Sequence, residues 1–358
     1  ARRHLVLHAR RRLARPEVAR QAGRAAQQRA GARRFWATMQ GMRILAITDS
    51  PHTLRPASDT TVAILEEARL RGHQVWVCEI NELWLQHGTP GASARAVSTV
   101  SRTTAPALTI SDTRERLPLA HFHVVLMRKD PPYDSVYHQA TQMMEYARGQ
   151  TFLCNDPRGL REANEKLYIF HFPELVAPTI VTHRLDELRA FLEEQGGEMV
   201  VKPLDGYGGS AVFHARRGDS NTNAILEVST HNGHRWVMAQ RYLPEGKQGD
   251  KRILLLGGEP IGCLLRVPQG GDLRSNMVIG GLATASTLTA RDLEICARVR
   301  PRLLQDGLHF VGLDVIGTYL TEINVTSPTG VQAIDRLLNT RLENQIVDYL
   351  EKNAPLSL

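Results

Sequence analysis

Three oxygen-bearing side chains lie close together near the C-terminal end of the sequence. Asp314 falls inside an apolar run, and Glu322 and Asn324 follow two residues apart in the next run, LTEINV. Residues two apart on a strand point to the same face, so a hairpin here would bring all three together. Two carboxylates and an amide oxygen suit Mg²⁺, with positions left for water and phosphate. Acids on a solvated strand face would show the same spacing, and this alternative stays open.

A glycine-rich segment follows a lysine in the middle of the chain. Lys202 ends the apolar run EMVVK, and DGYGGS (205–210) precedes the run AVFHA. Glycines let backbone N–H groups approach phosphate oxygens closely, so this turn is a candidate phosphate site. A strand rather than a helix follows, which excludes a dinucleotide-binding motif, and the segment is not a P-loop. Without Lys202, an ordinary β-hairpin turn would explain the segment better.

Further cationic side chains stand in or beside apolar runs. They are Arg128, Lys129, Lys166, Lys251, Arg252, Arg266 and Arg274. Taken singly, each is more often a solvated surface charge, although Arg266 ends the apolar run GCLL. The glycine-containing segment 268–286 is expected to be a mobile loop of the kind that closes over reactive intermediates. Simple disorder is the alternative.

Several catalytic chemistries lack support in the sequence. Neither the nucleophile motif GxSxG nor the zinc motif HExxH is present, and no His falls at a metal spacing with a Cys. The four cysteines form no CxxC, which argues against a disulfide framework or a structural zinc site and favours a reducing cytoplasm. They are Cys78, Cys154, Cys263 and Cys296. The remaining candidates suit phosphate, Mg²⁺ and carboxylate chemistry.

Charge is distributed unevenly along the 358 residues, whose net charge is +7. Residues 1–41 contain eleven arginines and one acid and carry +10, whereas the chain from Met42 on carries −3. A mildly acidic body argues against a nucleic-acid-binding domain. No apolar run approaches the roughly 20 residues of a membrane span. The segment 1–41 is expected to be disordered or not native: it could be upstream sequence translated before a start at Met39 or Met42, a transit peptide, or a nucleic-acid arm.

The elements that must position the candidate residues differ between the two halves of the chain. From Met42 to about 165, apolar strands alternate with helices, which indicates a parallel α/β sheet. The expected strands are 42–48, 74–80, 123–127 and 151–155, and the expected helices are 59–72 and 135–148. Residues 86–120 are polar and are expected to form a long loop.

The second half has strands with shorter connections and few helices, which indicates an α+β arrangement. The expected strands are 198–202, 211–215, 236–242, 252–256, 262–267, 310–317 and 320–325. Helices are expected near 185–195, 289–306 and 333–352. Leu338, Leu342, Ile346 and Leu350 recur every four residues in the last of these, which predicts one apolar helix face.

Six segments in order resemble bacterial glutathione synthetase, an ATP-grasp ligase. They are MRKDPPYD (127–134), NEKLY (164–168), KPLDGYGGS (202–210), MAQRYLP (238–244), GDKRILL (249–255) and GLDVIG…LTEINVTSPTG (312–330). The resemblance runs from Met42 to about Lys352. It implies an N-terminal α/β substrate domain (42–165) with a parallel sheet, a two-part ATP-grasp domain (166–352) and a short tail (353–358).

The resemblance also implies a reaction. The family joins γ-glutamylcysteine to glycine: ATP phosphorylates the cysteinyl carboxylate, and the glycine amine attacks the acyl phosphate. Mg²⁺ is the implied metal, with Mn²⁺ as an alternative. A cytoplasmic homotetramer is expected, without nucleic-acid or membrane partners. A ligase for another acid or amine is the first rival, and a nucleic-acid-binding protein acting through the basic tail is the second.

Matched positions give each candidate residue an implied role. Lys166 and Lys202 would hold ATP phosphates, and the turn would cover them through Gly206, Tyr207, Gly208, Gly209 and Ser210. A hinge would meet adenine largely through backbone groups, with Asp250 nearby; its residues are Gln240, Arg241, Tyr242 and Leu243. Asp314, Glu322 and Asn324 would bind Mg²⁺. Peptide carboxylates and the charge of the transferred group would be held by Arg252, Arg266 and Arg274.

Two positions depart from the pattern familiar in enterobacterial members of that family. Leu282 stands where an Arg is expected in the loop, which puts the loop's closing contacts in question. Arg241 stands where an Asn is familiar in the hinge, and a contact through the backbone would tolerate this change.

Overall fold

The computed structural model describes residues 31, 36, 41–270 and 281–356. Four adjacent parallel strands form one side of its first sheet, which confirms the predicted α/β arrangement of the N-terminal half. They are β1 (Arg43–Thr48), β2 (Gln74–Glu79), β7 (Val124–Met127) and β8 (Phe152–Cys154). The sheet order is β3-β4-β2-β1-β7-β8, with β5 and β6 paired to β4.

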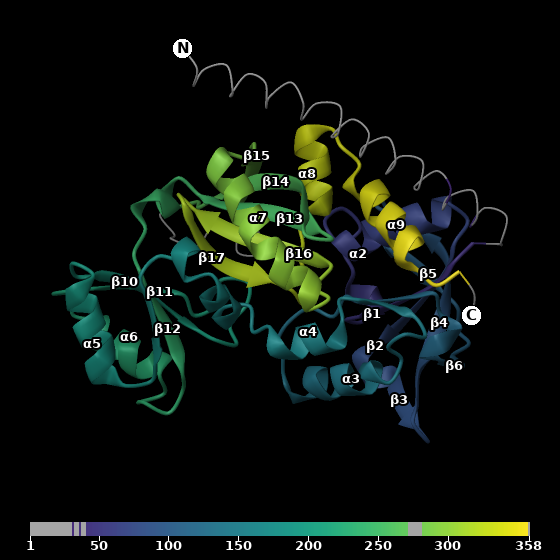
Figure 1. Ribbon diagram of the computed structural model, residues 1–358, viewed down its shortest axis with the longest axis horizontal. Helices are drawn as coiled ribbons and strands as arrows, with labels where there is room; N and C mark the ends of the chain where they lie inside the picture. Colours follow the sequence, from purple (N-terminus) through teal and green to yellow (C-terminus); the bar gives the residue numbers. More distant parts are fainter. Residues whose placement is uncertain (1–30, 32–35, 37–40, 271–280, 357–358) are drawn as a thin grey trace, which may run out of the picture.

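Alternate residues of β1 pack against helices on opposite faces of this sheet. Leu45 and Ile47 join the core that includes α3 (Ser135–Glu145), whereas Ile44 and Ala46 join the core that includes α2 (Thr60–Leu70). Figure 1 shows α3 and α4 (Pro157–Glu162) on one side of the sheet, and α2 with α9 (Leu342–Asn353) on the other. Helix α2 begins after Asp59, whose carboxylate accepts a hydrogen bond from Thr61 N at 2.7 Å.

The segment 86–120 is not the predicted long loop. It contains three whole strands, β4 (Thr89–Val100), β5 (Leu108–Ile110) and β6 (Glu115–Pro118), and it begins at the last residue of β3 (Leu83–Gln86). Ala92 and Ala94 of β4 are completely buried, so this strand fills its core face with small residues of low β propensity. A prediction based on Val, Ile and aromatic residues therefore misses it.

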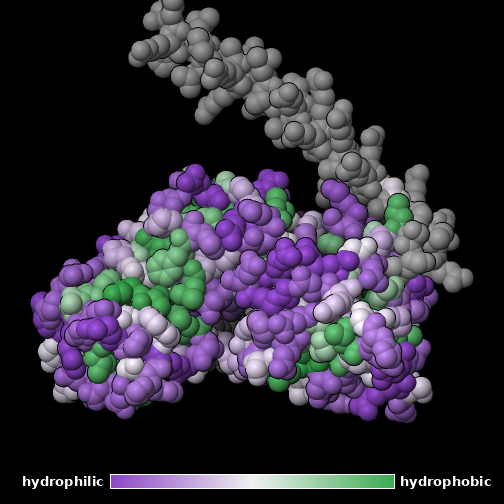
Figure 2. Space-filling view, turned by 60° about the horizontal axis from the view of Figure 1, so that its bottom comes forward, coloured by the Kyte–Doolittle hydropathy of each residue, from purple (hydrophilic) through white to green (hydrophobic). Residues whose placement is uncertain are grey.

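The second sheet is antiparallel and has the order β11-β10-β12-β9. Its strands are β9 (Thr179–Thr182), β10 (Glu198–Pro203), β11 (Phe213–Arg216) and β12 (Val237–Arg241). Leu188 and Leu192 of α5 (Leu185–Glu194) and Leu226 of α6 (Thr222–Ser229) complete its core. Figure 1 places this small unit at one end of the molecule, and Figure 2 shows a hollow between it and the larger part.

The third sheet carries most of the predicted metal and arginine residues. Its order is β15-β14-β13-β16-β17, and every neighbouring pair is antiparallel. The strands are β13 (Asp250–Leu256), β14 (Glu259–Val267), β15 (Leu282–Ala285), β16 (Phe310–Ile316) and β17 (Tyr319–Asn324). Helix α7 (Ala290–Gln305) contacts β14, and α8 (Val331–Leu338) contacts β14 and β15.

Two predictions for this half need correction. Strand β15 occupies part of the expected loop 268–286, because residues 282–285 pair with β14; residues 271–280 lie outside the described residues. The single helix expected at 333–352 is two helices, α8 and α9. Asn339 between them has φ of 52°, a left-handed conformation that ends α8, and Leu338 is half-exposed.

Short 3₁₀ helices connect several elements, and the one used below is η4 (Leu167–His171). The others are η1 (Pro51–Thr53), η2 (Ile80–Glu82), η3 (Leu119–His121), η5 (Pro173–Leu175) and η6 (Pro244–Lys247). Among the described residues, no helix is both long enough and apolar enough to span a membrane.

Trp36, in the Arg-rich segment, is part of the hydrophobic core. Its side chain is almost completely buried, and its ring meets that of His123 edge to face with centroids 4.9 Å apart. The indole Nε1 donates a hydrogen bond to the Glu351 carbonyl at 3.0 Å, and Gly41 N donates to the Trp36 carbonyl at 2.9 Å. The charge pattern of residues 1–41 gives no indication of this contact.

Candidate active site

One face of the third sheet carries a row of charged side chains. Directly opposed residues of antiparallel strands share a face, and the register pairs Arg252 with Asp314, Asp314 with Glu322, and Asp250 with Arg266. Asn324 is opposed to Gly312, two residues before Asp314, so it lies on the same face. The hairpin predicted from the sequence is confirmed, and two neighbouring strands add arginines to it.

Asp314 is buried between two arginines. Its carboxylate accepts hydrogen bonds from Arg252 at 2.6 and 3.1 Å and contacts Arg266 Nη2 at 2.9 Å. Arg266 Nε also donates to Asp250, and Arg252 Nη1 donates to the Thr329 carbonyl at 3.2 Å. Burial alone would raise the pKa of Asp314, but the charges of Arg252 and Arg266 outweigh it and lower that pKa well below its usual range. Asp314 is therefore ionised.

Lys166 and Lys202 approach strand β17 from two different elements. Lys166 Nζ contacts Glu322 Oε1 at 3.0 Å and donates to the Gly206 carbonyl at 2.5 Å. Lys202, at the end of β10, donates from Nζ to the Thr321 carbonyl at 3.2 Å. Burial lowers the pKa of Lys202 to about 8, although the charge of Glu322 opposes the shift. The two lysines expected to hold phosphate therefore lie beside a predicted metal ligand.

The glycine-rich turn lies between Lys202 and β11. A Cβ on Gly206 would come within 2.7 Å of the Pro203 ring, and Gly208 and Gly209 have φ of 61° and 80°, so glycine is required at this turn. Tyr207 is half-exposed and Ser210 is exposed. The contact between Lys166 and the Gly206 carbonyl ties this turn to the charged row.

The predicted hinge joins the second sheet to the third. Gln240 and Arg241 end β12, and Tyr242 and Leu243 lead toward β13. The Tyr242 ring stacks on His214 with centroids 4.1 Å apart. Arg241 N donates to the Pro178 carbonyl at 2.9 Å, and Arg241 Nη2 donates to the Tyr319 hydroxyl at 3.0 Å. Arg241, which departs from the enterobacterial pattern, therefore links the second and third sheets through its side chain.

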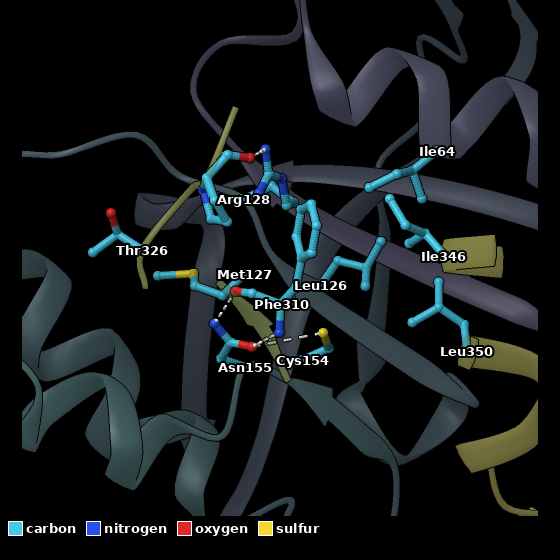
Figure 3. A pocket seen from close by; sticks show the side chains of 11 residues that line it. Ile64, Leu126, Met127, Arg128, Cys154, Asn155, Phe310, Thr326, Ile346 and Leu350 are labelled. Atoms are coloured by element: carbon cyan, nitrogen blue, oxygen red, sulfur yellow. Dashed lines mark hydrogen bonds between the residues drawn. The ribbon is translucent and has the colours of Figure 1, made fainter. Parts of the chain in front are cut away.

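A separate small pocket lies between the N-terminal sheet and the third sheet. Figure 3 shows Arg128 beside the ring of Phe310, with Asn155 hydrogen-bonded below them. Arg128 is buried and donates to Thr61 Oγ1 and to the Pro328 carbonyl, each at 3.1 Å. Burial lowers its pKa. None of the residues predicted to bind nucleotide or metal lines this pocket.

Sequence reasoning missed Glu165, which lies beside Lys166. Its Oε1 accepts hydrogen bonds from Val325 N at 2.9 Å, Thr326 N at 3.0 Å and Thr326 Oγ1 at 2.8 Å. Burial and then the charge of Glu322 raise its pKa, and the bonds from Thr326 oppose the shift. An acid inside the NEKLY segment was the available signal, but its partners lie about 160 residues away in the chain.

Two positions in the expected loop 268–286 complete the set of residues singled out from the sequence. Arg274 lies outside the described residues. Leu282, where an Arg is familiar, is exposed in β15 and pairs with Val267.

The cysteines do not supply a nucleophile. All four are buried and free of disulfides. Burial raises the pKa of Cys154 and Cys296 to about 12, so neither is a thiolate at neutral pH.

Comparison with known proteins agrees with this geometry. A family model for the prokaryotic glutathione synthetase ATP-grasp domain matches residues 165–339, and a model for the N-terminal domain of the same family matches residues 42–161. The glutathione synthetase of Gloeobacter violaceus is 51% identical over 316 residues, covering 86% of this chain and 96% of that protein. The glutathione synthetase of Synechocystis sp. is 43% identical over 320 residues, covering 87% and 99%.

Solved structures support the fold at lower identity. The D-cycloserine synthetase DcsG superposes with a TM-score of 0.61 at 17% identity, covering 86% of this chain and 99% of that one. The ATP-grasp ligase PsnB superposes with a TM-score of 0.57, also at 17% identity, over 87% and 99%. These likenesses confirm the predicted ATP-grasp fold class. On the sequence matches, the chain belongs to the prokaryotic glutathione synthetase family of ATP-grasp ligases.

Proposed function

We propose that the protein ligates γ-glutamylcysteine to glycine, with ATP converted to ADP and phosphate. The observation that carries the proposal is the charged row on the third sheet, which is buried at its centre around Asp314 and has Lys166 and Lys202 beside it. Phosphoryl transfer places negative charge on oxygens around phosphorus, and fixed cations in a water-poor site stabilise that charge. This chemistry needs no nucleophile from the protein.

The reaction has two steps. A carboxylate oxygen of γ-glutamylcysteine forms a bond to the γ-phosphorus of ATP, and the bond to the ADP oxygen breaks. The amine nitrogen of glycine then attacks the acyl carbon, loses a proton, and phosphate leaves with the former carboxylate oxygen. Both steps depend on aligned substrates, which the sheet and the lysines provide by holding the phosphates. Excluding water protects the acyl phosphate from hydrolysis.

The residues present fit a divalent cation. Glu322 and Asn324 offer oxygens on one face of β17, and Asp314 faces them across the strand pair. A carboxylate has about four lone-pair directions, of which the arginines occupy three on Asp314. We infer that Glu322 and Asn324 are the principal ligands and that Asp314 contributes its charge and at most one position. When bound, Mg²⁺, or Mn²⁺ in its place, would neutralise phosphate charge.

The nucleotide would lie between the second and third sheets. Lys166, Lys202 and the turn 206–210 would hold its phosphates, and the hinge 240–243 would meet the adenine ring.

Arg252 and Arg266, which neutralise Asp314, would also bind substrate in this proposal. The contacts of Arg252 engage three of its five N–H groups, and those of Arg266 engage at least two. The remaining N–H groups would bind a substrate carboxylate or the transferred phosphoryl group.

Phosphate release tests the proposal. The protein with ATP and Mg²⁺ should release phosphate only when γ-glutamylcysteine and glycine are both present, and mass spectrometry should detect glutathione. Replacing glycine with alanine, β-alanine or longer amino acids separates this activity from a ligase for another amine. No release with the complete mixture would contradict the proposal.

Three further properties stay proposals. A homotetramer is expected from the resemblance, and light scattering would test it. A cytoplasmic location rests on the scattered cysteines of the sequence. A nucleic-acid role for residues 1–41 would require steeply salt-dependent RNA or DNA binding that disappears when the segment is removed. The charged row provides no argument for that role.

A further inference from the structure

Three consecutive residues connect the separate parts of the site. Asn164 donates from its amide to the Leu204 carbonyl at 3.2 Å, beside the glycine-rich turn. Lys166 contacts Glu322 and the Gly206 carbonyl. Glu165, between them, bonds to the end of β17 and to the turn after it. Asn164 and Lys166 contact the expected nucleotide segments. Within the described part of the chain, the hydrogen bonds of the Glu165 side chain go to the segment that carries the metal ligands.

Glu165 fixes the backbone on both sides of Asn324. Its main-chain carbonyl accepts a hydrogen bond from Ile323 N at 3.0 Å, and its side chain accepts one from Val325 N at 2.9 Å. The same carboxylate oxygen also binds both donors of Thr326. Strand β17 ends at Asn324, so the strand ladder cannot hold the following residues in place. A partly buried carboxylate with three donors does this instead, and hydrogen bonds to a charged acceptor are the stronger kind.

The Asn324 side chain is held at a second point. Its Nδ2 donates to the Gly312 carbonyl at 3.3 Å, which sets which end of the amide faces away from β16. Because its backbone and its amide group are both fixed, the side-chain oxygen of Asn324 points in a single direction. Metal ligands held in this way bind more tightly, because their orientation is fixed before the ion arrives.

We propose that Glu165 is a positioning residue for the metal site, which acts by holding Asn324 and its neighbours in the geometry that binds a divalent cation. The inference rests on the proposed function, since the metal site is itself a proposal. Glu165 contributes the shape of the site and does not contact the ion.

Metal binding in the presence of ADP tests this role without relying on turnover. Mn²⁺ binding is measured by electron paramagnetic resonance, and ADP binding without metal is measured by calorimetry, on the full chain. Glu165→Gln keeps the side-chain volume but removes the charge, and we expect the Kd for Mn²⁺ to rise about ten- to a hundredfold. Metal-free ADP binding and the Tm should stay unchanged. Glu162→Gln, an exposed acid at the end of α4, is the matched control and should bind Mn²⁺ normally.

Two further variants separate position from charge and cover a folding failure. Glu165→Asp keeps the charge but withdraws the carboxylate by one methylene, so it should also bind Mn²⁺ weakly. Thr326→Val removes one of the three bonds to Glu165 and should raise the Kd by about fivefold. If Glu165→Gln does not fold, the result for Thr326→Val decides the question.

Several results would overturn the inference. Normal Mn²⁺ binding by Glu165→Gln or by Thr326→Val is one of them. Full affinity in Glu165→Asp would mean that the charge matters and the position does not. A parallel loss of Tm and of metal-free ADP binding would show a structural role only. If the unsubstituted protein binds no Mn²⁺ with ADP, the proposed metal site fails and the role of Glu165 fails with it.

Discussion

The Lys202 side chain should take up a proton when nucleotide binds. This side chain is almost completely buried, and within the described part of the chain its Nζ donates to a carbonyl oxygen but forms no ion pair with a carboxylate. Burial lowers its pKa from 10.5 to about 8, so about half of the protein molecules carry a neutral Lys202 at pH 8. Phosphate oxygens beside Nζ would favour the charged form and return the pKa toward its ordinary value.

The size of the effect follows from the shift. If binding restores the ordinary pKa, uptake is about half a proton per nucleotide at pH 8 and nearly one at pH 9. The affinity should then fall about fivefold between these pH values, because the free protein must first be protonated.

In the protein without ligand, Lys202 also makes the folding stability depend on pH. The direction of this dependence is opposite to that of an ion-paired lysine, whose pKa is raised on folding. The unfolded chain binds the extra proton between pH 8 and 10.5, so stability rises across that window, by about 3 kcal/mol at most.

Calorimetry gives a direct measurement of this uptake. MgADP is titrated into the protein at pH 8 in buffers with different ionisation enthalpies, and the slope of the observed enthalpy gives the number of protons bound. Lys202→Met should lose both the uptake and much of the affinity. Lys202→Arg should keep affinity but lose the uptake, since a guanidinium stays charged throughout. Uptake of the same size in Lys202→Met, or no uptake in the unsubstituted protein, would refute the reasoning.

Three further changes have expected results. Glu322→Gln should raise the Mg²⁺ concentration needed for turnover while leaving the fold intact, and near-normal turnover at limiting Mg²⁺ would contradict the assigned ligand. Asp314→Asn should lower the free energy of unfolding by about 3–5 kcal/mol in urea denaturation, because two buried arginines lose their shared partner. Trp36→Ala should lower it by about 3–5 kcal/mol, and Trp36→Phe by about 1 kcal/mol through loss of one hydrogen bond. Unchanged unfolding midpoints for both Trp36 variants would show that the indole does not pack as described.

Local patterns predicted the elements that are apolar and short. The strands of β1, β2, β7 and β8 stand out as Val-, Ile- and Leu-rich runs, and Asp314 stood out as a charge inside such a run. Strand β4 did not stand out, because its buried positions are Pro, Gly and Ala apart from Val97. The break between α8 and α9 depends on one left-handed residue, Asn339, inside a pattern that continues with helical spacing across it.

The sequence does not predict which charged residues form pairs, and the reason is different. Arg252 meets Asp314 because β13 and β16 are neighbours, although α7 and two other strands separate them in the chain. That neighbour relation is a property of sheet order, and residue spacing carries no record of it. Glu165 was missed for the same reason. Trp36 was missed because its surroundings in the sequence are polar and basic, so no apolar periodicity marks it.

Pairing also explains how this sheet face accommodates so many buried and partly buried charges. A buried charge without a partner is strongly unfavourable, yet this sheet face holds three acids and two arginines, with a lysine against it. Lys166 neutralises Glu322, and the two arginines neutralise Asp314 and Asp250.

This pairing affects how phosphate and metal would bind. Each charged group already has an ion-pair partner, and a bound phosphate or metal ion would replace that partner. Nucleotide alone would draw Lys166 from Glu322 and leave that partly buried acid without its cation, whereas a metal ion bound with the phosphates would take the place of the lysine. The contact between Lys166 and Glu322 thus favours nucleotide and metal binding together over either one alone.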